Sequence, residues 1–283
     1  VSTMASDLNV EFTADEGNAV DDTDIFAFSE GEEIGDDATQ PQDIGIVEDE
    51  TEDRETENEE FEDTVLPAAA SDDFEIEDGV LVKYHGTERD VLVVPDNVTT
   101  IGLRAFSTAY ARKIVLGENV KVIESEGFAG SGVHIVEMPY VTTIESEAFS
   151  GCGSLEKVEF GNELKTIDYN AFENCENLGG ELTIPESVTK IGDYAFCNTR
   201  IEKVTFLCTD ITYGVSIFSR NDSLKEMYIY GGTLPSWQTS EPWSAESLEK
   251  VYIGSNVKSL GYHAFSRCAK LQDVTIEPGQ YDT

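Results

Sequence analysis

The sequence is poor in basic residues. It holds 18 Lys and Arg against 57 Asp and Glu, so the formal net charge of its 283 residues is −39. Proteins bind phosphate groups mainly through Lys and Arg, so this deficit argues against nucleic acid or an anionic membrane as a partner. The chain also lacks any run of about eighteen apolar residues, the length that a helix needs to cross a bilayer, and we expect no membrane insertion.

Residues typical of catalytic and metal chemistry are also scarce. The three histidines, His85, His134 and His263, lie far apart, and the five cysteines include no Cys-x-x-Cys pair of the kind that binds zinc. No Gly-x-Ser-x-Gly, phosphate-binding loop or His-Glu-x-x-His motif occurs. We therefore expect no enzyme activity, no cofactor and no metal site.

Most of the negative charge lies at the start of the chain. Residues 1–71 hold 24 of the acidic residues and one Arg, which leaves a charge of −16 for residues 72–283. A segment with so few large apolar side chains buries too little surface to offset the entropy lost on folding. We expect residues 1–71 to be an acidic, disordered leader that ends in a linker.

Beyond the leader, one aromatic position recurs about every 22 residues, usually directly after Ala. The first six members are separated by 22, 21, 23, 24 and 22 residues. A unit this short cannot bury its own apolar residues, so the period predicts a solenoid in which equivalent residues of successive coils stack. The predicted structural core at this position consists of Phe106, Phe128, Phe149, Phe172, Phe196, Phe218, Trp243 and Phe265.

Two further positions repeat in phase with the aromatic one. The first is a pair of apolar residues two apart, which begins with Leu92 and Val94 and occurs nine times. This spacing is typical of a strand with one face inward. The second is an apolar residue five before the aromatic, from Ile101 to Leu260. Each coil is therefore predicted as a strand, a short second strand and a tight or helical turn, with about nine parallel strands and eight coils over residues 92–283.

The two ends of the predicted solenoid differ. Alternating apolar residues around Asp78-Gly79 predict a type I′ hairpin, and we expect residues 72–91 to cap the first coil. At the other end, Val274 and Ile276 begin a ninth strand, but no aromatic position follows. We expect the solenoid to be incomplete there, where an uncovered coil could make end-to-end contact.

Residues 182–196, Leu-Thr-Ile-Pro-Glu-Ser-Val-Thr-Lys-Ile-Gly-Asp-Tyr-Ala-Phe, resemble the BspA-like class of bacterial leucine-rich repeats. The resemblance covers about residues 74–279. It implies a right-handed superhelix on a secreted or surface-attached bacterial protein, with roles in adhesion or protein binding and no shared catalytic residues. The expected function is therefore non-catalytic binding of a protein or polysaccharide at the cell surface. The alternative is a structural spacer within a larger surface protein or enzyme.

The outward side chains of the strands are the candidate binding face. Tyr228 and Tyr252 should lie side by side on adjacent strands, either as cross-strand packing or as an aromatic contact patch for a protein or glycan. Residues of opposite charge alternate in the preceding column and should pair across strands. The candidate binding residues are Tyr228, Tyr252, Lys203, Thr205, Glu226 and Lys250.

The cysteines follow the repeat as well. Cys152, Cys175 and Cys268 each lie three residues after the aromatic position, which predicts small buried core residues. Cys152 and Cys175 fall in adjacent coils, where stacking could bring them within disulfide range, so a bridge between them is left open.

Overall fold

The computed structural model describes residues 71–234, 246–261, 264–265 and 268–279. The predictions for the leader, apart from Ser71, and for Trp243 and His263 lie outside the described residues.

An antiparallel hairpin covers the first coil. After the short 3₁₀ helix η1 (Ser71–Asp73), β1 (Phe74–Glu77) pairs with β2 (Val80–Tyr84). Both turn residues have positive φ, 48° at Asp78 and 83° at Gly79, as a type I′ turn requires. The strand β2 then pairs in parallel with the second strand of the first coil. The predicted hairpin cap is confirmed.

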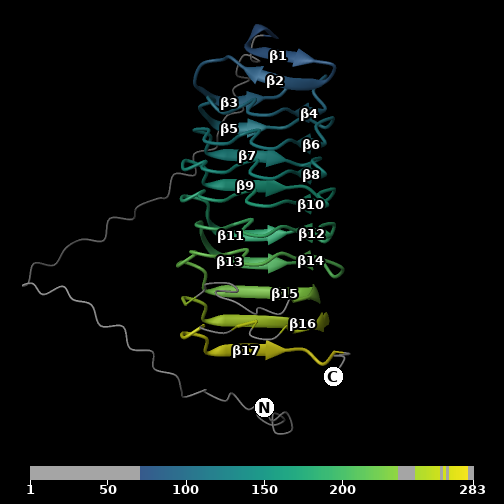
Figure 1. The fold of residues 1–283 in the computed structure, drawn as a ribbon, viewed down its shortest axis with the longest axis vertical. Coiled ribbons are helices and arrows are strands. Elements are labelled where there is room, and N and C mark those ends of the chain that lie inside the picture. Colours follow the sequence, from purple (N-terminus) through teal and green to yellow (C-terminus); the bar gives the residue numbers. More distant parts are fainter. Residues whose placement is uncertain (1–70, 235–245, 262–263, 266–267, 280–283) are drawn as a thin grey trace, which may run out of the picture. The chain divides into compact units, whose positions relative to one another are not determined.

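Nine parallel strands form the first column of the solenoid (Figure 1). Inward residues of neighbouring strands stack in register from β3 to β9, with Leu92 opposite Ile114 and Ile114 opposite Val136, and again from β11 to β17; the strand pairing is interrupted between β9 and β11. The nine predicted strands are therefore confirmed. They are β3 (Arg89–Val93), β5 (Ala111–Val115), β7 (Ile135–Met138), β9 (Lys157–Phe160), β11 (Gly179–Ile184), β13 (Arg200–Phe206), β15 (Glu226–Thr233), β16 (Lys250–Ser259) and β17 (Asp273–Ile276).

Six two-residue strands form a second column, and each places the residue five before the aromatic in the core. The long strands β15 and β16 reach into this column too, because Thr233 of β15 lies opposite Thr212. The prediction for Leu260 is wrong: its side chain is 41% exposed, and Val257 is buried instead. Since β16 continues for ten residues, it brings Val257 to the core before the chain reaches Leu260. The short strands are β4 (Thr100–Ile101), β6 (Val122–Ile123), β8 (Thr143–Ile144), β10 (Thr166–Ile167), β12 (Lys190–Ile191) and β14 (Thr212–Tyr213).

The repeated phenylalanines form a stacked ladder inside the coils. From Phe106 to Phe218, six rings are fully buried, and neighbouring centroids lie 4.6 to 5.6 Å apart. Phe265 is partly buried against the same core. Tyr84 was not predicted to join the ladder; it precedes Phe106 by one period of 22 residues and packs on it with a tilted ring, the two centroids 5.7 Å apart. Tyr84 thus joins the capping hairpin to the ladder.

The segments at Ala-Phe are hydrogen-bonded tight turns, which is one of the two predicted alternatives. The residue two before the aromatic adopts a left-handed conformation, for example Glu147 at φ 60° and Tyr194 at φ 56°. In the described part of the chain η1 is the only helix, and no helix there is long and apolar enough to cross a membrane.

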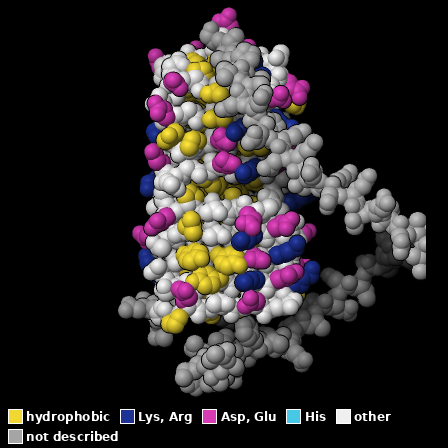
Figure 2. All heavy atoms as spheres, turned by 180° about the vertical axis from the view of Figure 1, so that it is seen from behind, with side chains coloured by type: hydrophobic (Ala, Val, Ile, Leu, Met, Phe, Trp, Pro, Cys, Tyr) yellow, Lys and Arg dark blue, Asp and Glu magenta, His cyan; other side chains and the backbone are white. Residues whose placement is uncertain are grey.

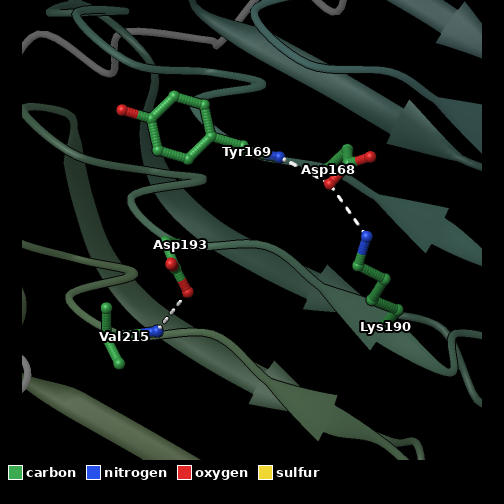
Figure 3. Close-up of polar contacts among 5 residues, drawn as sticks. All are labelled: Asp168, Tyr169, Lys190, Asp193 and Val215. Carbon is green, nitrogen blue, oxygen red and sulfur yellow. Dashed lines mark hydrogen bonds and ion pairs between the residues drawn. The ribbon is translucent and has the colours of Figure 1, made fainter.

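Carboxylates satisfy backbone N–H groups at these corners (Figure 3). Asp168 accepts a bond from the Tyr169 N–H at 2.9 Å and also pairs with Lys190 Nζ at 3.0 Å. Asp193 accepts from the Val215 N–H of the next coil at 2.8 Å. Some acidic residues of the solenoid therefore have a structural role, because their carboxylates accept hydrogen bonds from backbone N–H groups at the corners that strand pairing does not satisfy.

The cysteines lie in the core as unbridged thiols. Cys152 and Cys175 are fully buried and donate to the carbonyl oxygens of Phe128 and Phe149 at 3.0 and 3.1 Å. Burial raises the pKa of the Cys175 thiol well above its ordinary value. The prediction of small core residues is confirmed for these two, whereas Cys268 is only partly buried.

Candidate binding face

The strand register brings the two predicted tyrosines together. Tyr228 of β15 lies between Thr205 of β13 and Tyr252 of β16, and the two tyrosine rings are 6.0 Å apart. Tyr230 was not among the predicted residues, and its ring lies 5.2 Å from that of Tyr252. The strand β15 continues beyond its inward pair, so Tyr230 projects from the same face as Tyr228, two residues earlier. That alternation is the signal in the sequence that would have identified it.

Two lysines flank the central tyrosine, one from each neighbouring strand. Lys203 Nζ lies 5.6 Å and Lys250 Nζ 5.8 Å from the centroid of the Tyr228 ring, within the range of cation–π attraction. Each ammonium group also faces a carboxylate, with Lys203 3.2 Å from Glu181 and Lys250 3.7 Å from Asp273. The predicted cross-strand alternation of charge is present here.

Carboxylates also hold the tyrosine hydroxyl groups. The Tyr228 hydroxyl donates to Glu226 at 2.8 Å. Hydrogen bonding to the Glu277 carboxylate raises the pKa of Tyr252 to about 12. The Tyr252 phenol is therefore neutral at physiological pH, and both rings are restrained before any ligand binds.

We call Tyr228, Tyr230, Tyr252, Lys203 and Lys250 the tyrosine–lysine patch. Figure 2 shows hydrophobic side chains gathered over the C-terminal coils, beside alternating basic and acidic side chains. The patch is a strand surface, and its two ammonium groups and the hydroxyls of Tyr228 and Tyr252 are engaged with neighbouring carboxylates. Such a surface is suited to contact with another macromolecule through aromatic area and charge.

The histidines do not come together. His85 pairs with Glu75 at 2.9 Å, and His134 pairs with Glu156 at 3.1 Å, on different coils. Within the described ranges, no group of three or more His, Cys, Asp and Glu side chains is arranged to hold a metal ion. These two histidines therefore contribute separate surface pairs.

Comparison with known proteins identifies the repeat. The family model described as "BspA type Leucine rich repeat region" matches six copies, in residues 84–179, 142–272 and 240–281. No curated protein matches the chain.

Several solved structures are similar to this chain. A leucine-rich repeat protein from Bacteroides ovatus is 21% identical, with a TM-score of 0.40. The match covers 66% of this chain and 61% of that protein, so this chain spans less than two thirds of its length. The leucine-rich repeat protein of T. pallidum is 19% identical over 72% of this chain and 91% of that one, with a TM-score of 0.48. A leucine-rich cell surface protein from Faecalibacterium prausnitzii is 16% identical over 74% and 92%, with a TM-score of 0.25.

Proposed function

Because this chain belongs to the BspA-type leucine-rich repeat family, we propose that it is a secreted or cell-surface bacterial protein that binds another protein and has no catalytic role. The tyrosine–lysine patch carries this proposal. Interfaces are enriched in tyrosine, and a few well-packed aromatic anchors supply most of the binding free energy.

The patch favours a protein as its ligand. Three tyrosines on two adjacent strands offer aromatic area, and Lys203, Lys250 and their carboxylate partners surround it with both signs of charge. Restrained side chains lose little conformational entropy when a partner binds, which favours affinity. Mixed charge at the rim selects the orientation of the partner more than it adds affinity.

The proposal is tested by binding to matrix proteins. Surface plasmon resonance would measure the chain against immobilised collagen, fibronectin and laminin, together with a double variant Tyr228→Ala/Tyr252→Ala. We expect binding to at least one of the three and a loss of about tenfold or more in the variant, because each interface anchor is worth about 1 kcal/mol or more.

A matched control removes two tyrosines elsewhere. Tyr169 and Tyr194 form an exposed edge-to-face pair with centroids 6.2 Å apart, on the corner of the coils rather than on the strand face. The double variant Tyr169→Ala/Tyr194→Ala should bind as the unsubstituted chain does. Equal losses in both double variants would remove the patch as the binding site. Binding to none of the three proteins would instead favour the spacer role.

Location is tested separately. If the chain is attached to the cell surface, protease treatment of intact cells of the source bacterium should degrade it. If it is secreted, it should be found in the culture medium. Protection of the chain until the cells are lysed would contradict surface exposure.

A further inference from the structure

A groove opens at the other end of the solenoid, where β3, β5 and β7 begin. Its volume is about 440 Å³, within the range of small-molecule sites, and its lining is mainly polar. It lies on coils before β11, whereas the tyrosine–lysine patch lies on β13 to β16. The two surfaces can therefore be tested independently.

Two arginines line the groove, and one of them has free hydrogen-bond donors. Arg89 places Nη2 2.5 Å from Asp73, and hydrogen bonds to the side chains of Tyr84 and Asp73 raise the pKa of its guanidinium. Arg112 is exposed, and no ion pair to it occurs within the described part of the chain. The N–H groups of the exposed Arg112 guanidinium are therefore available to donate to a ligand oxygen.

An aromatic ring forms one wall. Tyr110 is 63% exposed, and its ring lies against Gly132. A Cβ atom at position 132 would come within 2.3 Å of the ring, so glycine is needed for the ring to lie there. A ring held in this way presents an apolar face beside the polar groups.

The charges in the groove indicate a neutral ligand. Glu88, Asp90 and Glu156 line it together with the arginines. An anionic ligand would meet the carboxylates, and a cationic one would meet the guanidinium groups. A neutral molecule with many hydroxyl groups can donate to the carboxylates and accept from the arginines, because each hydroxyl does both.

From this combination we infer that the groove binds a neutral hexose unit of a polysaccharide. The ring of Tyr110 packs against the apolar face of the sugar, Arg112 donates to its oxygens, and the carboxylates accept from its hydroxyl groups. This site adds a glycan ligand to the protein partner of the strand face.

The experiment titrates the isotope-labelled chain with simple sugars. The neutral probes are the methyl glycosides of glucose, galactose and mannose, and the charged probes are methyl glucuronide and glucosamine. With a Kd near 1 mM, about 20 mM of a neutral glycoside should shift the backbone amide signals of Ala111 and Gly132. If no neutral glycoside shifts them, or if a charged sugar binds more tightly, the inference is overturned.

Variants assign the contacts. Tyr110→Ala and Arg112→Gln should each weaken binding about tenfold, and Tyr110→Phe should bind as the unsubstituted chain does. Gly132→Ala displaces the ring without removing it and should weaken binding too. Unchanged affinity in both Tyr110→Ala and Arg112→Gln would refute the site.

A second groove on the same edge of the solenoid supplies the matched control. It has a volume of about 270 Å³ and contains arginines and acids, including Arg220 and Asp222, but no aromatic residue. Arg220→Gln should leave sugar binding unchanged. A loss equal to that of Arg112→Gln would indicate a general effect of charge and would overturn the assignment.

Discussion

Replacing one ring in the middle of the phenylalanine ladder tests the packing directly. Phe149 is fully buried, and its ring stacks on Phe128 at 4.6 Å and on Phe172 at 4.9 Å. Truncating a buried Phe to Ala typically costs about 3–5 kcal/mol, from lost burial and from the cavity that remains. We expect Phe149→Ala to lie in the upper half of that range, because parallel strands on both sides hold the coils apart and limit collapse into the cavity.

The corresponding change in melting temperature is large enough to measure. For an ordered region of this size, about 4 kcal/mol corresponds to a fall in Tm of roughly 8–16 °C. Scanning calorimetry and urea unfolding would measure it, with Tyr169→Ala as the control, since that ring is 44% exposed. A Tm for Phe149→Ala within about 2 °C of the unsubstituted chain would refute the ladder as a source of stability.

Two further predictions concern the corners and the surface charge. Glu147 is exposed and has a φ of 60°, a conformation that a β-branched residue disfavours and glycine tolerates. Glu147→Val should therefore lower the free energy of unfolding by about 1 kcal/mol or more, whereas Glu147→Gly should not. Equal losses for the two variants in urea unfolding would contradict backbone strain at the corner. Lys258 lies 2.8 Å from Asp210 and lowers the pKa of that carboxyl. The ion pair therefore stabilises the fold at pH values above the pKa of Asp210 in the unfolded chain, which is near 4. This stabilisation is lost as the pH falls through the lower pKa of Asp210 in the folded chain. Asp210→Asn should accordingly be less stable at pH 7 and indistinguishable at pH 2 to 3, whereas a difference that persists in acid would contradict this origin.

Most of the fold could be predicted from the sequence because the repeat carries it. The positions of Leu92, Ile101 and Phe106 recur in phase, and stacked coils place equivalent residues in contact. Tyr84 was missed because it lies in the hairpin, outside the aromatic set defined by Ala-Phe. Leu260 was misplaced because the length of β16, rather than spacing, decides which residue reaches the core.

The candidate sites were predictable only in part. The adjacency of Tyr228 and Tyr252 follows from the register of parallel strands. The addition of Tyr230 depends on how far β15 extends. The groove has no motif, because Arg89, Tyr110 and His134 come from successive coils and meet only at the edge where their strands begin.

The period of about 22 residues by itself determined the solenoid with its core, and the low content of basic residues predicts that nucleic acid and anionic membranes are not partners. Both are properties of residue types and spacing, which stacking converts directly into contacts between coils. The tertiary structure alone decided which polar groups are satisfied and which are left open. The Asp168 carboxylate, for example, accepts a hydrogen bond at a corner of the backbone, while the Arg112 guanidinium is exposed in a groove and has no ion pair within the described part of the chain. Whether a polar group finds a partner depends on distances of a few ångströms between neighbouring coils. The sequence around each residue does not contain this information.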